Sequence, residues 1–365
     1  MLFQTQQKMP PNGGGFFQLR RVFRALMLLI TSIFLLISCQ QKASVASFNG
    51  KTMGTTYNIT VVGSSESINA SLSSAQHDQI AAAIDKKLLY INQLMSTYIP
   101  DSEISRFNQS AHGEWFTVSS DTLEVIQYSL YLSEITQGLF DITVSPLIEL
   151  WGFGKSGATE FPAPSAIEAA RTMVGWQYLE IDEASSRIKK IKPLTIDLSA
   201  IAKGYGVDVI SDLLEELGIN NYLVEIGGEI RVKGINPEQQ LWRIGVETPS
   251  VFQTSAQKVI ALEDVSVATS GDYRNFFEKE GIRYSHTIDP TTGRPVIHDI
   301  ASITVLANTA MAADGLATAF MALGEQGALR LAEELSLPIY ILRYQQDMFS
   351  ESFSSDFSHY LNEKK

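Results

Sequence analysis

An apolar stretch near the C-terminal end, residues 311–323, constrains the fold of this chain more than any other feature. It contains Ala, Leu, Met and Phe and no Lys, Arg or Glu, a composition that predicts a helix buried in the protein core. With 365 residues, of which 45% are hydrophobic, the chain can form one large domain or two moderate ones. We therefore expect the rest of the chain to be organised around this helix.

Three residues of this helix do not fit a purely structural core. Asp314 and Thr318 are four positions apart, so one helix face presents a carboxylate and a hydroxyl. A buried carboxylate is costly unless it is paired, hydrogen-bonded or bound to a metal. In one interpretation, Asp314 accepts from nearby backbone amides and Thr318 bonds back to its carbonyl. In the other, both residues bind Mg²⁺, which prefers oxygen ligands. Gly315 would let a ligand approach the backbone closely.

The N-terminal residues predict export. Three arginines precede the apolar residues 25–37, which end in small residues before Cys39. This is the layout of a secretory signal, and the apolar run is too short to favour a membrane-spanning helix. The site resembles a bacterial lipobox. That resemblance implies cleavage of residues 1–38, lipid attachment to Cys39 and a short tether over 39–50.

Composition and charge exclude several classes of function. The formal net charge is −12, and residues 1–38 contain basic but no acidic residues, so the mature part is more acidic still. An acidic body without a basic patch argues against nucleic acid as a partner. Lipid modification of Cys39, the only cysteine, would exclude cysteine chemistry and thiolate metal sites. An anionic ligand would need a metal, a helix N-terminus or a few placed cations.

Hydrophobic periodicity and turn residues predict an α+β fold with two lobes and a mainly antiparallel sheet packed against helices. Helices are expected at 76–95, 120–137, 165–174, 199–217, 311–323 and 325–334. Strands are expected at 55–62, 179–181, 187–191, 222–226, 229–233, 242–246, 258–262, 266–269, 284–288, 302–306 and 337–342. The main domain is expected to span 51–345, followed by a peripheral polar tail over 346–365.

Familiar nucleotide-binding motifs are absent. No G-x-G-x-x-G follows a predicted strand, no P-loop pattern occurs, and no His pair has metal-ligand spacing. A Rossmann-type site is therefore not expected. Gly227 and Gly228 lie between two predicted strands, where a tight hairpin turn is the simplest interpretation.

Two other segments contain candidate polar residues. Lys203 lies in the first turns of a helix that Ser199 is expected to cap. A lysine there opposes the helix dipole, which becomes favourable if a phosphate binds at the same end. The alternative is a surface ion pair of Lys203 with Asp197 or Asp208.

The second segment, residues 285–295, is a strand that enters a Pro/Gly turn. His286 is its candidate acid or base, and Arg294 is a candidate phosphate-binding cation.

A series of short motifs resembles the ApbE family, in the order of that family and over nearly the whole mature chain. The motifs are residues 53–55, 95–98, 100–108, 138–147, 151–154, 197–204, 227–228, 270–274, 286–295 and 313–319. Family members are FAD:protein FMN transferases, often periplasmic lipoproteins, with an α/β fold similar to the T-fold. The resemblance implies a lipid-anchored enzyme at the periplasmic face of the bacterial inner membrane.

The resemblance also implies a Mg²⁺-dependent reaction with FAD as substrate. A threonine hydroxyl of an acceptor protein attacks the FMN phosphate of FAD, AMP leaves, and FMN stays attached through a phosphoester bond. Acceptors of the family carry the motif Asp-x-x-Ser/Thr-Gly-Ala-Thr and include subunits of Nqr- and Rnf-type complexes.

The matching motifs indicate which positions of this sequence correspond to the site residues of the family. Asp314, Thr318 and the backbone carbonyl of Ala200 become Mg²⁺ ligands. His286 becomes the candidate for proton transfer near the attacking hydroxyl, with Asp314 or a water as alternatives. The residues at FAD-contacting positions are Met53, Tyr98, Leu139, Phe140, Asp141, Asp197, Lys203 and Ile288.

One local match and two further functions stay open. Residues 156–159 match the end of the acceptor motif, although Phe153 stands where that motif has Asp. Thr159 is thus a candidate for self-flavinylation, and a chance match in a Gly/Ser loop is the alternative. The other functions are an FAD pyrophosphatase, in which water replaces the threonine, and a flavin-binding lipoprotein without catalysis. The combined presence of Asp314, Thr318 and His286 argues against the last.

Overall fold

The computed structural model describes residues 44–63, 73–154, 157, 161–246, 258–271, 276–279, 282–345 and 348–361. The chain divides into two compact units, and the described residues belong to the second, Ala43–Lys365. Cys39 and Thr159 lie outside the described residues, so the lipid anchor and the self-modification stay predictions. Within the described ranges, no helix combines the length and apolar character needed to cross a membrane.

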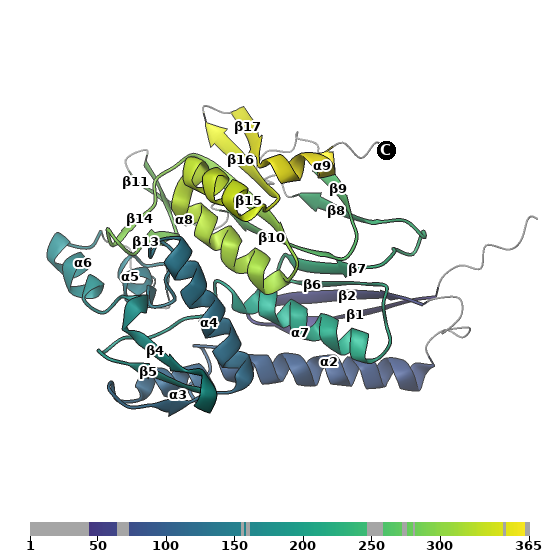
Figure 1. Cartoon of the computed structure of the whole chain (residues 1–365), viewed down its shortest axis with the longest axis horizontal. Helices are drawn as coiled ribbons and strands as arrows, with labels where there is room; N and C mark the ends of the chain where they lie inside the picture. Colours follow the sequence, from purple (N-terminus) through teal and green to yellow (C-terminus); the bar gives the residue numbers. More distant parts are fainter. Residues whose placement is uncertain are drawn as a thin grey trace, which may run out of the picture. The chain divides into compact units, whose positions relative to one another are not determined.

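An antiparallel sheet of eight strands forms the centre of this unit (Figure 1). It joins strands from both ends of the described chain, which confirms the predicted α+β class. The strand order is β1 (Val45–Thr52), β2 (Thr55–Val62), β6 (Tyr222–Ile226), β7 (Glu229–Lys233), β10 (Val265–Gly271), β15 (Ile300–Ala307), β16 (Ile339–Gln345) and β17 (Met348–Phe353).

Different elements cover the two faces of this sheet. Helices α7 (Ala202–Glu216) and α8 (Ala310–Leu335) lie side by side on one face (Figure 1). The hairpin of β8 (Trp242–Val246) and β9 (Lys258–Leu262) packs on the other. The alternation along β15 shows this, since Val305 joins the core under the helices and Leu306 the core under the hairpin. All residues of β15 are buried, as expected of a strand covered on both faces.

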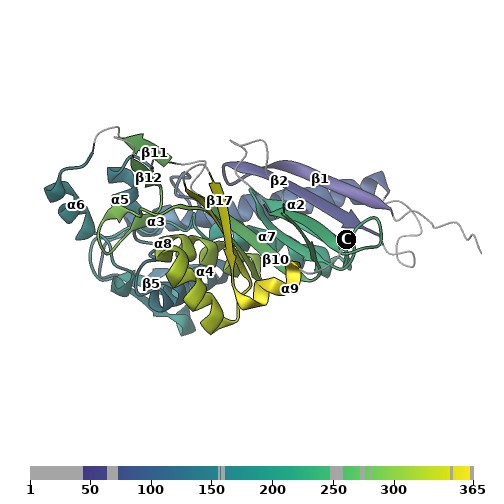
Figure 2. The same ribbon diagram turned by 90° about the horizontal axis from the view of Figure 1, so that it is seen from above.

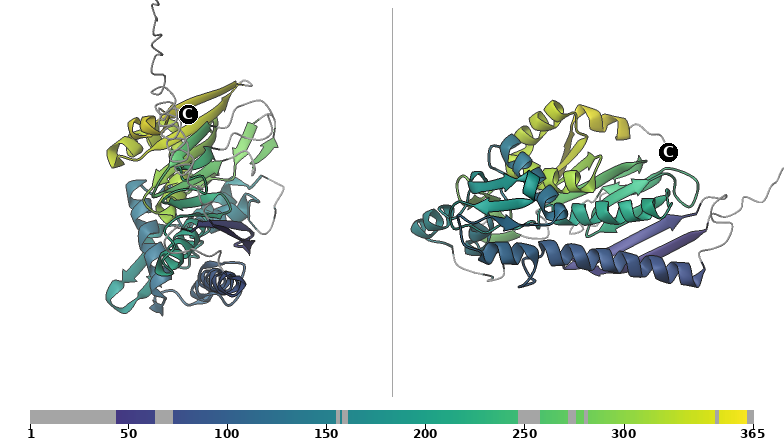
Figure 3. Two further views of the ribbon diagram at one scale, coloured as in Figure 1. Left: turned by 90° about the vertical axis from the view of Figure 1, so that its right-hand side faces the viewer. Right: turned by 60° about the horizontal axis from the view of Figure 1, so that its bottom comes forward.

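The strands β1 and β2 form a hairpin whose two turn residues, Met53 and Gly54, both have positive φ (49° and 73°). These angles are typical of a two-residue type I′ turn. Helix α2 (Ser74–Met95) runs along the hairpin (Figure 3), and its residues Ile84 and Leu88 share a core cluster with Ile59. The predicted helix 76–95 and strand 55–62 are confirmed.

The remaining elements gather mainly at one end of the sheet (Figure 2). The helices there are α3 (Glu103–Gln109), α4 (Ser120–Ile135), α5 (Ser145–Leu150) and α6 (Pro164–Arg171). The strands β3 (Phe116–Thr117), β4 (Leu179–Asp182) and β5 (Arg187–Lys190) form a small sheet there. Two hairpins follow: one of β11 (Phe276–Lys279) and β12 (Ile282–Ser285), the other of β13 (Ile288–Asp289) and β14 (Arg294–Pro295). The short helices η1 (Trp176–Tyr178) and η2 (Glu183–Ser185) belong to this end, and η3 (Ser355–Phe357) and α9 (Ser358–Leu361) follow β17.

Helix α8 is the predicted buried helix. Its residues Ala313, Ala317 and Phe320 are fully buried. The helix is interrupted at Gly324, whose φ of 71° and ψ of 173° are not helical. A glycine tolerates this positive φ, so the two predicted helices, 311–323 and 325–334, are the two segments of one kinked element.

The structure extends beyond both predicted boundaries of the main domain, residues 51 and 345. Strand β1 begins at Val45, so residues 45–50, half of the tether expected over 39–50, belong to the sheet. At the other end, β17 pairs with β16 and Phe357 is fully buried. Residues 348–361 of the segment 346–365, which was expected to be a peripheral tail, therefore contribute to the sheet and the core.

Two local predictions are also wrong. Helix α7 begins at Ala202 without a side-chain cap, and Ser199 does not serve as one. Instead, the backbone N–H of Ser199 donates to Asp197 Oδ1 at 2.8 Å, which is an Asx turn. The strand expected at 284–288 is divided between β12 and β13, with His286 in the bend between them.

Candidate active site

Helices α7 and α8 cross with their backbones in contact at Gly204. A Cβ atom on Gly204 would overlap the carbonyl oxygen of Ala310 and would lie 2.8 Å from Cβ of Asp314. A glycine is required for this approach because any side chain would push the helices apart. The crossing places Asp314 over the first turn of α7.

Each helix supplies a carboxylate to the N-terminus of the other. Asp314 on α8 accepts from the N–H of Gly204 at 3.0 Å. In return, Asp208 on α7 accepts from the N–H groups of Ala310 at 2.9 Å and Met311 at 2.8 Å. Because α7 has no side-chain cap of its own, Asp314 supplies an acceptor that the helix would otherwise lack.

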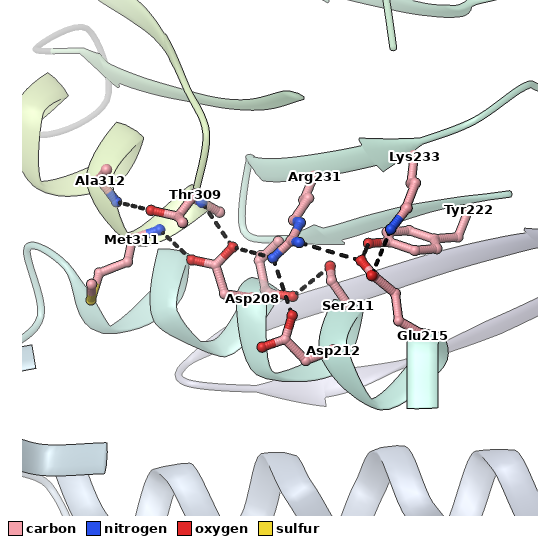
Figure 4. Close-up of polar contacts among 12 residues, drawn as sticks. Asp208, Ser211, Asp212, Glu215, Tyr222, Arg231, Lys233, Thr309, Met311 and Ala312 are labelled. Atoms are coloured by element: carbon pink, nitrogen blue, oxygen red, sulfur yellow. Dashed lines mark hydrogen bonds and ion pairs between the residues drawn. The ribbon is translucent and has the colours of Figure 1, made fainter. Parts of the chain in front are cut away.

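Asp208 is further fixed by Arg231 on β7 (Figure 4). Nη1 of Arg231 lies 3.1 Å from Asp208 and 3.3 Å from Asp212, and its Nη2 lies 3.3 Å from Glu215. This network joins α7, β7 and the start of α8. Asp208 thus pairs with Arg231, and the alternative of a surface ion pair of Lys203 with Asp197 or Asp208 is wrong because Lys203 has other partners.

Lys203 instead lies between two buried carboxylates. Its Nζ is 3.4 Å from Asp314 Oδ1 and 3.4 Å from Glu229 Oε1. Asp314 is 3% exposed and Glu229 is 4% exposed. Glu229 opens β7 directly after the turn at Gly227 and Gly228. Two acids with little access to solvent therefore share one ammonium.

The electrostatics of this triad follow from its burial. Burial raises the pKa of Asp314, although Lys203 and the N–H of Gly204 favour its charged form. Burial, followed by the charge of Asp314, raises the pKa of Glu229 to about 8. Burial alone would lower the pKa of Lys203, but the two carboxylates raise it above the ordinary lysine value. The ammonium stays charged beside two acids whose ionised forms are costly, and a divalent cation would stabilise those forms.

The triad borders a cleft of about 680 Å³ that contains most of the predicted site. The predicted residues that line it are Leu139, Phe140, Asp141, Asp197, Ala200, Lys203, His286, Ile288, Asp314 and Thr318. Met53 and Tyr98 are not among its lining residues. Met53 packs against Gly206 on α7, and Tyr98 is 75% exposed. Arg294, a candidate phosphate-binding cation, is exposed and also lies outside the lining.

Asp141 has a structural role in the cleft wall. Its Oδ1 accepts from the N–H of Thr143 at 2.8 Å and from the hydroxyl of Thr143 at 2.7 Å, and its Oδ2 accepts from the N–H of Trp176 at 3.1 Å. Burial nevertheless raises its pKa. These bonds fix the loop that presents Phe140 and Leu139 to the cleft.

The donors around Asp314 fit a hard cation. Asp314 contributes a carboxylate, Thr318 a hydroxyl and Ala200 a position on the cleft wall. The Thr318 hydroxyl lies 3.4 Å from the Ser270 hydroxyl. No group of three or more His, Cys, Asp or Glu suited to a metal occurs in the described part of the chain. A cation here would therefore depend on hydroxyl, carbonyl and substrate oxygens as well as Asp314, which is the coordination Mg²⁺ prefers.

Sequence reasoning missed Glu229 as a site residue. A charged residue that directly follows a Gly-Gly turn and opens a strand was the available signal. That signal does not show that the residue is buried or that Lys203 lies opposite it. Ser270, which lines the cleft beside Thr318, was identified only as part of a motif.

Comparisons with known proteins match the chain to one family of enzymes. The model of the ApbE family matches residues 53–341. A curated FAD:protein FMN transferase from Vibrio cholerae is 44% identical over 340 residues, which cover 93% of this chain and 99% of the relative. The FAD:protein FMN transferase from Escherichia coli K12 is 34% identical, with 94% and 99% covered.

Solved structures show the same similarity. The flavin transferase ApbE from Vibrio cholerae matches with a TM-score of 0.79 and 44% identity, over 87% of this chain and 100% of the other. The apo form of the flavinyl transferase ApbE from Pseudomonas stutzeri matches with a TM-score of 0.80 and 35% identity, over 89% and 99%.

Proposed function

The chain belongs to the ApbE family and is a flavin transferase, and from this premise we propose the details of its reaction. The FMN part of FAD is transferred to a threonine hydroxyl of an acceptor protein, AMP is released, and Mg²⁺ is required. The observation that carries the proposal is the Asp314–Lys203–Glu229 triad at a cleft of about 680 Å³, beside the Thr318 hydroxyl.

Charge supports this assignment. A pyrophosphate carries several negative charges, and the chain is acidic overall, with a formal net charge of −12. Lys203 is the cation that the triad places at the cleft wall, where it binds and orients a phosphate. Asp314, Thr318 and the Ala200 carbonyl would hold Mg²⁺, which neutralises phosphate charge when bound.

The wall formed by Leu139, Phe140 and Ile288 supplies apolar surface for a flat ring system, while the triad supplies the polar end. The pyrophosphate group is thereby oriented toward Lys203. The FAD-contact roles of Met53 and Tyr98, which do not line the cleft, stay predictions from the family resemblance.

His286 handles the proton of the acceptor threonine. The threonine oxygen forms a bond to the phosphorus of the FMN part as the bond from that phosphorus to the AMP oxygen breaks. The hydroxyl proton passes to the imidazole, and the AMP oxygen leaves with the bonding electron pair. His286 lines the cleft together with Asp314, and its ring centroid lies 6.4 Å from that of Phe153.

The acceptors we propose are proteins with the motif Asp-x-x-Ser/Thr-Gly-Ala-Thr, such as subunits of Nqr- and Rnf-type complexes. Lipid attachment at Cys39 would hold the enzyme at the periplasmic face of the inner membrane, where such subunits are accessible. Labelling of membrane fractions with a lipid probe, with Cys39→Ser as the control, tests the anchor.

One experiment tests the reaction. The protein is mixed with FAD, Mg²⁺ and an acceptor domain that carries the motif, and flavin fluorescence on the acceptor is read in a gel. We expect labelling by the wild type and none by Asp314→Ala or in the presence of excess chelator. Release of FMN and AMP without labelling would indicate a pyrophosphatase instead, and unchanged bound FAD would indicate a binding protein. Full labelling by Asp314→Ala would refute the metal assignment.

A further inference from the structure

Glu229 is a buried acid of the triad to which the proposed reaction assigns no role of its own. Its Oε1 lies 3.4 Å from Lys203 Nζ, whereas its Oε2 has no hydrogen-bond partner within the described residues. The residue is 4% exposed and belongs to the cleft lining. Retaining a carboxylate with one unsatisfied oxygen in such a place is costly. This cost calls for a specific function.

The turn beside it does not supply that function. Glu225, not Glu229, accepts from the N–H of Gly228 at 2.8 Å and so stabilises the β6–β7 turn. The side chain of Glu229 contacts Lys203, which already has Asp314 as an ion-pair partner. A second acid is therefore not needed to hold Lys203 in the cation-free site.

A second acid is needed once a divalent cation binds Asp314. Both carboxylate oxygens of Asp314 lie near Lys203 Nζ, at 3.4 Å and 3.5 Å, so a cation competes with the ammonium for this acid. With Asp314 alone, cation binding would leave a partly buried ammonium without a carboxylate partner. With Glu229 in place, the ammonium keeps a carboxylate at 3.4 Å.

We propose that Glu229 is a positioning residue that holds the Lys203 ammonium at the cleft wall while Asp314 binds a divalent cation. This inference rests on the proposed function, which assigns the cation to Asp314. Glu229 acts through Lys203 and is not itself a ligand of the cation. The ammonium and the cation can then face the same phosphates together.

The test compares cation binding with FAD binding in Glu229→Gln, which keeps the shape of the side chain and removes its capacity to ionise. Mn²⁺ is the metal probe and is titrated by electron paramagnetic resonance. We expect the half-saturating Mn²⁺ concentration to rise at least about tenfold, because Lys203 then depends on Asp314 alone. Affinity for FAD without metal, measured by fluorescence quenching, is expected to stay equal or to rise. Structural damage would instead weaken both.

Two further variants control for charge and for folding. Glu216→Gln removes the same charge from the exposed end of α7 and is expected to change neither affinity by more than about twofold. Glu229→Asp keeps the charge and is expected to bind Mn²⁺ within about threefold of the wild type. Thermal unfolding shows whether each variant is folded at the titration temperature.

A double-mutant cycle tests whether Glu229 acts through Lys203. In Lys203→Met no ammonium competes for Asp314, so the added Glu229→Gln change is expected to alter Mn²⁺ affinity by less than about threefold. An equal loss in both backgrounds would overturn the proposal, because Glu229 would then act on the cation directly. Unchanged Mn²⁺ affinity in Glu229→Gln alone would also overturn it.

Acceptor labelling is measured separately so that the two proposals can fail independently. A protein that shows the Mn²⁺ shifts and labels no acceptor would refute the proposed reaction and support the role of Glu229. A protein that labels acceptors and whose Mn²⁺ affinity is insensitive to Glu229→Gln would support the proposed reaction and refute the role of Glu229.

Discussion

The backbone N–H of Gly204 donates to the carboxylate of Asp314 at 3.0 Å, at the point where α7 and α8 approach too closely for a side chain at position 204. This contact connects the packing of the core to the geometry of the site. Asp314 is oriented by one helix while it belongs to the other. A change in the helix crossing would therefore move the carboxylate relative to Lys203.

Gly204→Ala is expected to lower the free energy of unfolding by about 2–4 kcal/mol, because the added methyl would overlap the backbone of Ala310. Gly206→Ala is the control, since its methyl would meet side-chain ends and no backbone: Cε of Met53 at 2.8 Å and Cδ1 of Ile226 at 3.4 Å. We expect it to cost less than about 1 kcal/mol. Urea unfolding measures the free energy of unfolding of both variants. Equal losses would show that the contact of position 204 with the backbone of Ala310 does not determine the loss.

Asp208→Asn removes the charge that serves both the start of α8 and Arg231. We expect a loss of about 1–3 kcal/mol in the free energy of unfolding, since a partly buried guanidinium loses its closest acid. Asp212→Asn, at an acid whose side chain is 65% exposed beside the same Arg231, is expected to cost less than about 0.5 kcal/mol. Chemical denaturation distinguishes the two, and a larger cost for Asp212→Asn would contradict the network described here.

His286→Gln tests proton transfer apart from binding. We expect kcat for acceptor labelling to fall at least about 100-fold while KM for FAD changes by less than about threefold, because the imidazole acts on the attacking hydroxyl. His112→Gln, at an exposed position, serves as the matched control. A large rise in KM with unchanged kcat would mean that His286 binds FAD and does not handle the proton.

Phe357→Ala tests whether the C-terminal segment belongs to the core. Phe357 is fully buried in the cluster that includes Trp242 and Leu342, so we expect a loss of about 3–5 kcal/mol in unfolding free energy. Phe353→Ala, 41% exposed on the edge strand, is expected to cost about 1 kcal/mol. Thermal and urea unfolding measure both. Similar small losses of unfolding free energy in the two variants would show that this segment is peripheral.

Much of the fold could be predicted from local patterns. The composition of residues 311–323 indicated a buried helix, and alternation and turn residues located most strands of the sheet. The prediction was weakest at chain ends and caps. Phe357 lies in a short polar segment whose hydrophobic partners are distant in sequence, and Ser199 resembles a cap although Asp197 uses its N–H for a turn.

The sequence by itself determined which chemical groups are available and the order in which they occur: a carboxylate and a hydroxyl one helical turn apart, a lysine early in another helix, and motifs of one family throughout. Only the tertiary structure decided which of them meet. Lys203 and Asp314 are 111 positions apart, and they approach because glycine lets two helices cross at Gly204. The burial of Glu229 against Lys203 depends on the same crossing and on the register of β7. Side-chain periodicity specifies which face of an element is buried, but the partner on that face depends on long-range packing.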